Sequence, residues 1–209
     1  MVKELLGTKI GMTQLFDKQR NVVPVTVIDM NGWFVTQVKT EETDKYSALQ
    51  LGLVKKRYRE LPFSGKWLQD KKQFFAHVHE VCVDEKDAKA FSVGQKVALE
   101  NLDVSDKDDV AVAGTSRGLG FQGVVKRWGF KGGPSGHGST FHRKPGSIGN
   151  MCSEGNVIKG KKLPGHAGCQ RVTVKGLRVV KVDPASNYLF VKGAVPGKKN
   201  SLLFICKQG

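Results

Sequence analysis

Apolar and polar residues alternate along several short stretches of the chain, a pattern typical of half-buried β-strands. The alternation predicts strands at residues 22–28, 33–39, 46–54, 74–83, 95–100, 109–114, 172–183, 187–193 and 201–207. Asn31-Gly32 is a strong tight-turn signal, so we expect the first two strands to pair as a hairpin through residues 29–32. Residues 55–72 are polar and contain proline, which predicts a loop with at most one helical turn, and residues 84–91 predict a short helix or turn.

Many short strands with little helix predict a mostly β fold, namely an antiparallel barrel or sandwich. A length of 209 residues is enough for one large or two small domains. Residues 114–171 fall between two predicted strands, so we read them as an insertion rather than a linker. We therefore expect a single domain over residues 1–209. Its β-barrel body is formed by residues 1–113 and 172–209, and residues 114–171 form a long, basic, glycine-rich extension.

The positive charge of the chain is unevenly distributed. Residues 114–171 hold 15 of the 25 glycines, and their ten Lys and Arg residues are opposed only by Glu154, which leaves a net charge of +9. Residues 1–113 have a net charge of zero, and residues 172–209 contribute the remaining +6 of the total of +15. The glycine-rich segment is therefore the most basic part of the molecule.

The same segment has too few apolar residues to fold alone. Leu, Ile, Val and Phe make up 10 of its 58 residues, which is the composition of chains without a core. Ordering its backbone would cost on the order of 60–90 kcal/mol, at about 1–1.5 kcal/mol per residue. Its charge indicates that a polyanion orders it, although a solvated basic loop is the plain alternative.

Nucleic acid suits this segment better than the other common polyanion, an anionic membrane. Membrane-surface binding needs a basic amphipathic helix, and the density of glycine disfavours one of useful length. The sequence has no apolar run of 18 residues and no secretory signal at its N-terminus. We expect reduced thiols in a cytosolic compartment for its four scattered cysteines, Cys82, Cys152, Cys169 and Cys206.

The candidate RNA-binding residues are the cations, the histidines and one tryptophan of the basic segment. Lys and Arg neutralise phosphates and release counterions, while ring side chains stack on unpaired bases. These residues are Arg117, Lys126, Arg127, Trp128, Lys131, His137, His142, Arg143, Lys144, Lys159, Lys161, Lys162, His166 and Arg171.

Within the segment, apolar residues at helical spacing predict one or two helical turns over residues 121–128. We expect Phe121 to lie in a small local core, while local core and base stacking both stay open for Trp128. A second basic run, residues 55–59, is read equally well as a solvated surface or as an RNA contact.

Two enzyme-like patterns have weaker support. Gly118-x-Gly120-x-x-Gly123 imitates a dinucleotide-binding fingerprint, and Tyr188 and Lys192 have the spacing of a dehydrogenase catalytic pair. A dinucleotide fold needs a long helix after the glycines and an acidic residue about 20 positions further on. The first acid here is Glu154, 31 residues after Gly123, so we expect no enzyme and no cofactor.

Two groups of histidine and cysteine are incomplete as metal sites. His77, His79 and Cys82 lie on one predicted strand, and Cys152, His166 and Cys169 lie in the basic segment. A closed structural zinc site has four ligands in paired spacing, and neither group supplies them. We expect no metal.

Several stretches resemble the universal large-subunit ribosomal protein L3 family in its bacterial form. They are GTKIGMTQLF, GTSRGLGFQGVVKRWGF, HGSTFHRKPGSIG, KGKKLPGHAG and RVTVKGLRVVKVD, in the family's order and spacing over most of the chain. The resemblance implies a β-barrel body similar to a translation-factor barrel. It also implies an extension that threads through large-subunit (23S-type) ribosomal RNA towards the peptidyl transferase centre.

The resemblance further implies binding near the 3′ end of that RNA, a role in early subunit assembly, and proteins L14 and L19 as neighbours. The location would be a cytoplasmic ribosome, or an organellar one in a eukaryote, and the alternative function is a free-standing RNA chaperone. The tip nearest the catalytic centre would be Gly146, Ser147, Ile148, Gly149, Asn150 and Met151, continuing to Cys152. Asn150 stands where many bacterial members carry a methylated glutamine, so we expect no such modification.

Overall fold

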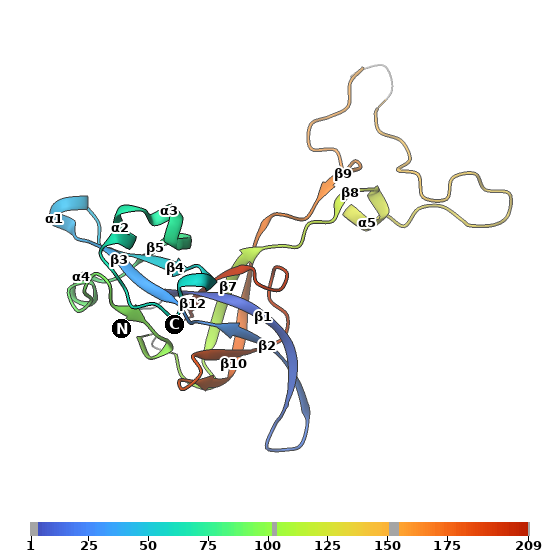
Figure 1. Cartoon of the computed structure of the whole chain (residues 1–209). Helices are drawn as coiled ribbons and strands as arrows, with labels where there is room; N and C mark the ends of the chain where they lie inside the picture. The colour runs from blue at the N-terminus through green and yellow to red at the C-terminus, as the bar shows by residue number, and fades with distance from the viewer. Residues whose placement is uncertain (1–3, 102–103, 151–154, 209) are drawn as a thin grey trace. The chain divides into compact units, whose positions relative to one another are not determined.

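The computed structural model describes residues 4–101, 104–150 and 155–208. The chain divides into two compact units, one formed by Met1–Thr115 with Arg171–Gly209 and the other by Ser116–Gln170. The fold is mostly β with little helix, as the alternating pattern predicts. The first unit contains two sheets, and the second contains one short ribbon of two strands (Figure 1).

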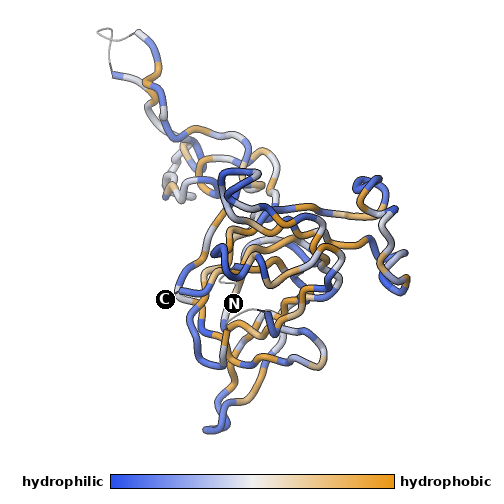
Figure 2. Tube along the Cα trace, turned by 90° about the vertical axis from the view of Figure 1, so that its left-hand side faces the viewer, coloured by the Kyte–Doolittle hydropathy of each residue, from blue (hydrophilic) through white to orange (hydrophobic). Residues whose placement is uncertain are grey.

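Six antiparallel strands of the first unit pair into a closed ring, in the order β1-β12-β7-β10-β11-β2. Their bounds are β1 Glu4–Phe16, β2 Val22–Asp29, β7 Asp109–Thr115, β10 Arg171–Asp183, β11 Tyr188–Lys192 and β12 Leu202–Lys207. Burial alternates along β11 and β12, because successive side chains point to opposite sides of the ring. Hydrophobic residues, coloured orange, are frequent in the body of this unit, and hydrophilic residues, coloured blue, gather in its outer loops (Figure 2). The inward side chains form the main core, which includes Leu6, Ile28, Val112, Leu189 and Ile205.

A second sheet, in the order β5-β4-β3-β6, packs against the same core. Its strands are β3 Trp33–Lys39, β4 Ala48–Val54, β5 Phe75–Cys82 and β6 Lys96–Val97. Short helical turns connect them: α1 Glu41–Asp44, η1 Lys56–Tyr58, α2 Lys66–Gln69, α3 Lys71–Phe74 and α4 Glu85–Ala88. A further turn, η2 Leu99–Asn101, follows β6 on the way to β7. Of the strand predicted at residues 95–100, only Lys96–Val97 is a strand, and Leu99–Asn101 is a helical turn.

The predicted hairpin between the first two strands is wrong. Strand β2 pairs with β1 and β11, whereas β3 pairs with β4 and β6 in the other sheet. Asn31 instead ties the connection to the ring, because its side chain donates to the Ser186 carbonyl at 2.8 Å. Met30 and Trp33 are buried on either side of Gly32, which has a φ of +83°. The Asn-Gly turn thus moves the chain from one sheet to the other.

Strand β1 was not predicted, because two glycines and several polar residues obscure its alternation. Gly7 is required by close packing, since a Cβ there would lie 2.5 Å from Cγ2 of Ile28. The strand is long enough to pair with β12 through Glu4–Thr8 and with β2 through Thr8–Phe16. It contributes to the ring and then continues as one arm of a hairpin.

Residues 55–72, predicted as a loop with at most one helical turn, contain η1, α2 and the start of α3. These turns are held by an aromatic cluster around buried Trp67. Its indole contacts the rings of Phe34, Tyr58, Phe63, Phe74 and Phe75, at centroid distances of 5.5 to 6.4 Å. The aromatic residues have no regular spacing in sequence, so a periodicity test does not detect them.

Among its described residues, the second unit has three regular elements: strands β8 Gly120–Gln122 and β9 Gly165–Ala167, which pair antiparallel, and helix α5 Val124–Trp128. The predicted helical turn is thus present, although it begins three residues later than expected. Described residues between α5 and β9 lie outside helices and strands. Among the residues that the structure describes, no helix is long and apolar enough to cross a membrane.

Candidate nucleic-acid interface

Two side chains at the end of helix α5 donate to one backbone carbonyl in the second unit. Nη1 of Arg127 and Nε1 of Trp128 donate to the Leu163 carbonyl at 2.7 and 2.9 Å. A Cβ on Gly165 would lie 2.5 Å from that Arg127 nitrogen, so a larger residue there would displace the guanidinium. Helix α5 ends at Gly129, whose φ of +73° gives the left-handed C-cap. This clamp joins α5 to the segment that enters β9.

Two cations lie near the Trp128 ring. The Arg127 guanidinium is 4.9 Å from its centroid and the Lys162 ammonium is 5.8 Å away, which fits cation–π contact. The side chain is 42% exposed, so it bonds the backbone and still leaves part of its ring open to solvent. The buried residue of α5 is instead Val124, which is 1% exposed.

Phe121 is not in a local core, which corrects the expectation from its helical spacing. It lies on β8 rather than on the helix, and its side chain is 77% exposed. His166 is its cross-strand partner on β9, so the two rings share one face of the ribbon. The other face carries Ala167, which is buried. The ribbon therefore has one packed face and one open face with two rings.

The chain after α5 folds back on itself through glycine. The Gly133 amide donates to the His142 carbonyl at 2.6 Å, and a Cβ on Gly132 would lie 2.5 Å from that same oxygen. The Phe141 ring covers Gly133, where a Cβ would come within 2.6 Å of it. This close backbone approach fixes the loop from which His137, His142, Arg143 and Lys144 project into solvent.

The predicted RNA-binding residues lie almost entirely on the surface. Arg127 is half-buried, and the other thirteen of the set are exposed. All except Arg171 belong to the second unit, where the sequence supplies Glu154 as the only carboxylate. These cations therefore carry a charge that the unit itself does not balance.

Arg171 lies instead at the start of β10 in the first unit, opposite Thr115. Its guanidinium stacks on the Phe204 ring at 4.6 Å. That ring also makes a T-shaped contact with His79, whose pKa is lowered by burial and by the nearby charges of His77 and Arg171. The contacts of Arg171 in this structure are thus with the first unit.

Gly146 to Asn150, from the predicted tip, are exposed, and the Ser147 hydroxyl donates to the Gly149 carbonyl at 3.1 Å. Met151 and Cys152 lie outside the described residues.

The geometry does not complete either enzyme-like pattern or a metal site. After Gly123 the helix runs only from Val124 to Trp128, far too short for a dinucleotide fold. Tyr188 and Lys192 lie on strand β11. Within residues 4–101, 104–150 and 155–208, no group of three or more His, Cys, Asp or Glu residues is placed to hold a metal ion.

Exposed cations without internal counter-charge, open rings and backbone close-packed through glycine define a nucleic-acid-binding class of protein. Comparison with known proteins makes this specific. The family described as "Ribosomal protein L3" matches residues 92–187. The chain is also 44% identical to large ribosomal subunit protein uL3 of Geobacter sulfurreducens, over 98% of this chain and 97% of that protein.

The uL3 protein of Geotalea daltonii is 46% identical, and that of Lactobacillus gasseri is 45% identical, each over 98% of this chain and 96% of the relative. The chain belongs to the ribosomal protein L3 family. The resemblance predicted from its motifs is confirmed. That family is a structural component of the ribosome and not a family of enzymes, in agreement with the expectation drawn from the incomplete enzyme-like patterns.

Proposed function

We propose that this chain is a structural constituent of the large ribosomal subunit and binds its ribosomal RNA through residues 114–171. The observation that carries the proposal is similarity to large-subunit uL3 proteins along nearly the whole chain. The unbalanced charge of the second unit supports it independently, because a segment of this composition needs an anionic partner.

Binding, rather than catalysis, is the mechanism. Exposed cations such as Lys126, Lys161 and Lys162 neutralise phosphates and release counterions, so affinity falls steeply with salt. Glycines at 132, 133 and 165 allow backbone to pack closely, a property that also suits contact with the sugar-phosphate chain. The two rings on the open face of the ribbon, Phe121 and His166, are placed to stack on an unpaired base.

The finer parts of the proposal rest on the family resemblance. The ring of six strands is a barrel akin to that of translation factors, and residues 1–113 with 172–209 form one domain from which 114–171 extends into the RNA. The tip around Gly146–Asn150 reaches towards the peptidyl transferase centre. The chain binds near the 3′ end of 23S-type RNA, acts early in assembly, lies beside L14 and L19, and works in a cytoplasmic ribosome. Asn150 carries no methyl group.

A sedimentation experiment tests the proposal. Cell lysate expressing the wild-type chain is spun through sucrose at high salt, beside a variant in which residues 131–160 are replaced by a short Gly-Ser linker. This replacement keeps Leu163 and strand β9, so the clamp at the base of the unit is preserved.

We expect the wild type to stay with the large subunit and the variant to accumulate in precursor particles. A wild type that washes into the soluble fraction would refute the ribosomal assignment. If it then bound any RNA with equal affinity, a free-standing RNA chaperone would be the correct reading.

A further inference from the structure

Asn31-Gly32 is the only Asn-Gly pair in the sequence, and it lies where the chain passes from β2 to β3. Asparagine is one of the chemically labile residues, and a following glycine has no side chain to shield its own backbone nitrogen. That nitrogen can attack the carboxamide carbon of the asparagine, which closes a succinimide ring and expels ammonia. Water then opens the ring, and the product is either aspartate or isoaspartate, in which the backbone runs through the former side chain.

In the folded chain, the carboxamide that would react is already bonded. Its nitrogen, Nδ2 of Asn31, donates to the Ser186 carbonyl at 2.8 Å, and the Asn31 backbone amide donates to Oδ1 of Asp29 at 2.9 Å. A side chain that is held at its end has less freedom to bring its carbon onto the Gly32 nitrogen. The nitrogen that the reaction expels is also the one that joins this turn to the ring of strands.

The backbone on both sides of the pair is held as well. The Met30 amide donates to the Asn187 carbonyl at 3.0 Å, and the Gly32 carbonyl accepts from the Val54 amide at 3.0 Å. Met30 and Trp33 are 2% and 1% exposed, and Gly32 between them is buried too. Ring closure needs the Gly32 peptide unit to move, and water must then reach it, so both steps require these contacts to open.

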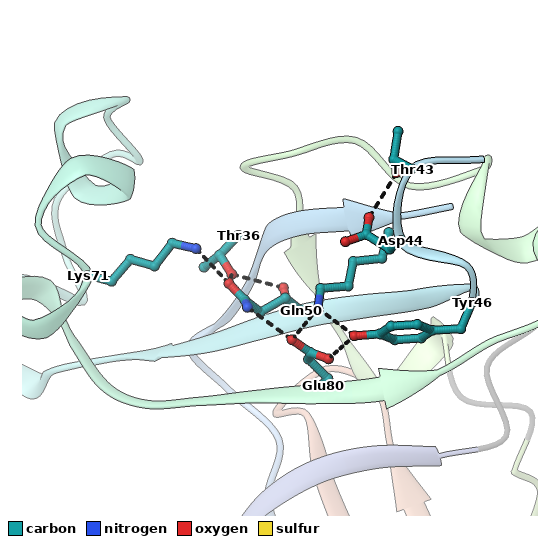
Figure 3. Close-up of polar contacts among 8 residues, drawn as sticks. Thr36, Thr43, Asp44, Tyr46, Gln50, Lys71 and Glu80 are labelled. Atoms are coloured by element: carbon teal, nitrogen blue, oxygen red, sulfur yellow. Dashed lines mark hydrogen bonds and ion pairs between the residues drawn. The ribbon is translucent and has the colours of Figure 1, made fainter. Parts of the chain in front are cut away.

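Strand β3, which begins directly after the pair, is fixed in turn by a polar network across its sheet (Figure 3). The Thr36 hydroxyl on β3 donates to the side-chain oxygen of Gln50 on β4 at 2.9 Å, and Nε2 of Gln50 donates to Glu80 on β5 at 3.3 Å. The Lys39 ammonium, at the end of β3, meets the same carboxylate at 2.8 Å. The turn is thus tied to the ring on one side and to a cross-linked sheet on the other.

We propose that Asn31-Gly32 is a self-modification site whose reactivity is controlled by the fold of the first unit. The closed connection keeps the residue as asparagine, and a chain in which the connection opens converts it to aspartate or isoaspartate with loss of ammonia.

Neither product can restore the connection. A carboxylate has no hydrogen to donate to the Ser186 carbonyl, and it adds a second negative charge to a turn that contains Asp29. Isoaspartate also lengthens a turn whose two ends are fixed. The change therefore runs one way and permanently marks chains whose sheet-to-sheet connection has been open.

An ageing experiment tests the control by the fold. The full chain is kept at mildly alkaline pH, in buffer and in enough urea to unfold it, and its tryptic peptide of residues 21–39 is followed by mass spectrometry. The conversion is read as the mass change from an amide to an acid, and fragmentation assigns it to Asn31 rather than Asn21. A synthetic peptide of residues 21–39, aged in the same two solvents, gives the reactivity without the fold and the effect of urea itself.

We expect Asn31 to convert at least about a hundredfold more slowly in the folded chain than in the peptide, because a buried and bonded site reacts only from opened molecules. In urea the two rates should agree. A folded chain that converts Asn31 as fast as the peptide would overturn the proposal.

The effect of the product is tested with Asn31→Asp, which carries one of the two products from the start. Its melting temperature should be about 2–6 °C below that of the wild type, since a buried carbonyl loses its donor. The control is Asn21→Asp, the same chemical change at an exposed position, which should stay within about 1 °C. Equal melting temperatures for the two variants would mean that the product closes as well as asparagine does, and the one-way mark would be wrong. Neither measurement involves RNA, so the proposed function is tested separately.

Discussion

Gly7 on β1 shows how a single hydrogen atom in place of a side chain can determine strand packing. A Cβ at this position would lie 2.5 Å from Ile28 and 2.8 Å from the Met30 sulfur, both buried. Gly11, on the same strand, has nothing within 4 Å of the equivalent point. Two glycines that look alike in sequence therefore have different structural requirements.

We predict that Gly7→Ala lowers the free energy of unfolding by about 1–3 kcal/mol, the range for overpacking a filled core. Urea unfolding followed by Trp fluorescence measures it. Gly11→Ala is the matched control and should change stability by less than about 0.5–1 kcal/mol in either direction. Equal losses in the two variants would mean that backbone flexibility, not packing, explains Gly7.

Phe121 is a single residue whose exposed ring we expect to matter for RNA binding rather than for stability. We predict that Phe121→Ala weakens binding to unpaired RNA by about 1–3 kcal/mol, the usual worth of one stacked base, while Phe121→Trp preserves binding. Stability should hardly change, because the side chain is 77% exposed. Phe16→Ala is the control, since Phe16 is 69% exposed on a hairpin of the other unit. The same loss in both variants would argue against a stacking site.

At the scale of elements, the described helix and strands of the second unit are short. A three-residue ribbon and a five-residue helix would not be stable as isolated pieces. The carbonyl of Leu163 links them by accepting from both Arg127 and Trp128. Local stability should therefore respond to each donor.

We predict that Trp128→Phe, which removes one donor and keeps a ring, lowers the local opening free energy by about 0.5–1.5 kcal/mol. Hydrogen exchange reports it at the Leu119 amide, which donates to Ala167 at 2.9 Å, and at the Ser116 amide, which donates to Gln170 at 2.8 Å. Protection there should fall a few-fold to about tenfold. The Val35 amide of the first unit is the internal reference and should be unchanged.

Sequence reasoning succeeded at this scale where burial follows a regular period. Most strands and the short helical turns at 85–88 and 124–128 were predicted, because alternation and helical spacing are local properties. It failed where tertiary contacts decide. The partner of β2 depends on Asn31 bonding to Ser186, 155 residues away, and the order of residues 55–72 depends on rings that converge on Trp67.

The candidate site was predicted in the same uneven way. Its cations stay a prediction, which rests on a charge excess over a glycine-rich segment that is visible in composition. The exposed ring of Phe121 was missed, since its helical spacing suggested a core and its strand pairing with His166 is not local. For Trp128, the sequence left local core and base stacking open. The structure shows its ring 42% exposed and its Nε1 bonded to the Leu163 carbonyl, and stacking on a base stays a prediction.

At the scale of the molecule, the first unit needs little from residues 116–170 to close its ring. Thr115 at the end of β7 and Arg171 at the start of β10 are direct cross-strand partners. A short turn could therefore join them, as in any β-hairpin.

We predict that replacing residues 116–170 by Asn-Gly gives a protein that folds, with a melting temperature within a few degrees of the full chain. Its affinity for RNA at moderate salt should fall by at least tenfold, because most of the unbalanced charge is removed. Circular dichroism and filter binding measure the two effects. Failure to fold would show that the first unit relies on the second, and undiminished RNA affinity would place the main contact elsewhere.

The exposed lysines and arginines between α5 and β9 have one more consequence, which concerns copies of the protein that find no RNA. Their described backbone lies outside helices and strands, and exposed segments of that kind are the preferred sites of proteolytic cleavage. In an assembled copy, nucleic acid would cover these sites. In a surplus copy, they would be accessible to proteases that cleave after basic residues. The abundance of the protein in a cell would then follow the supply of its RNA, without a dedicated regulator.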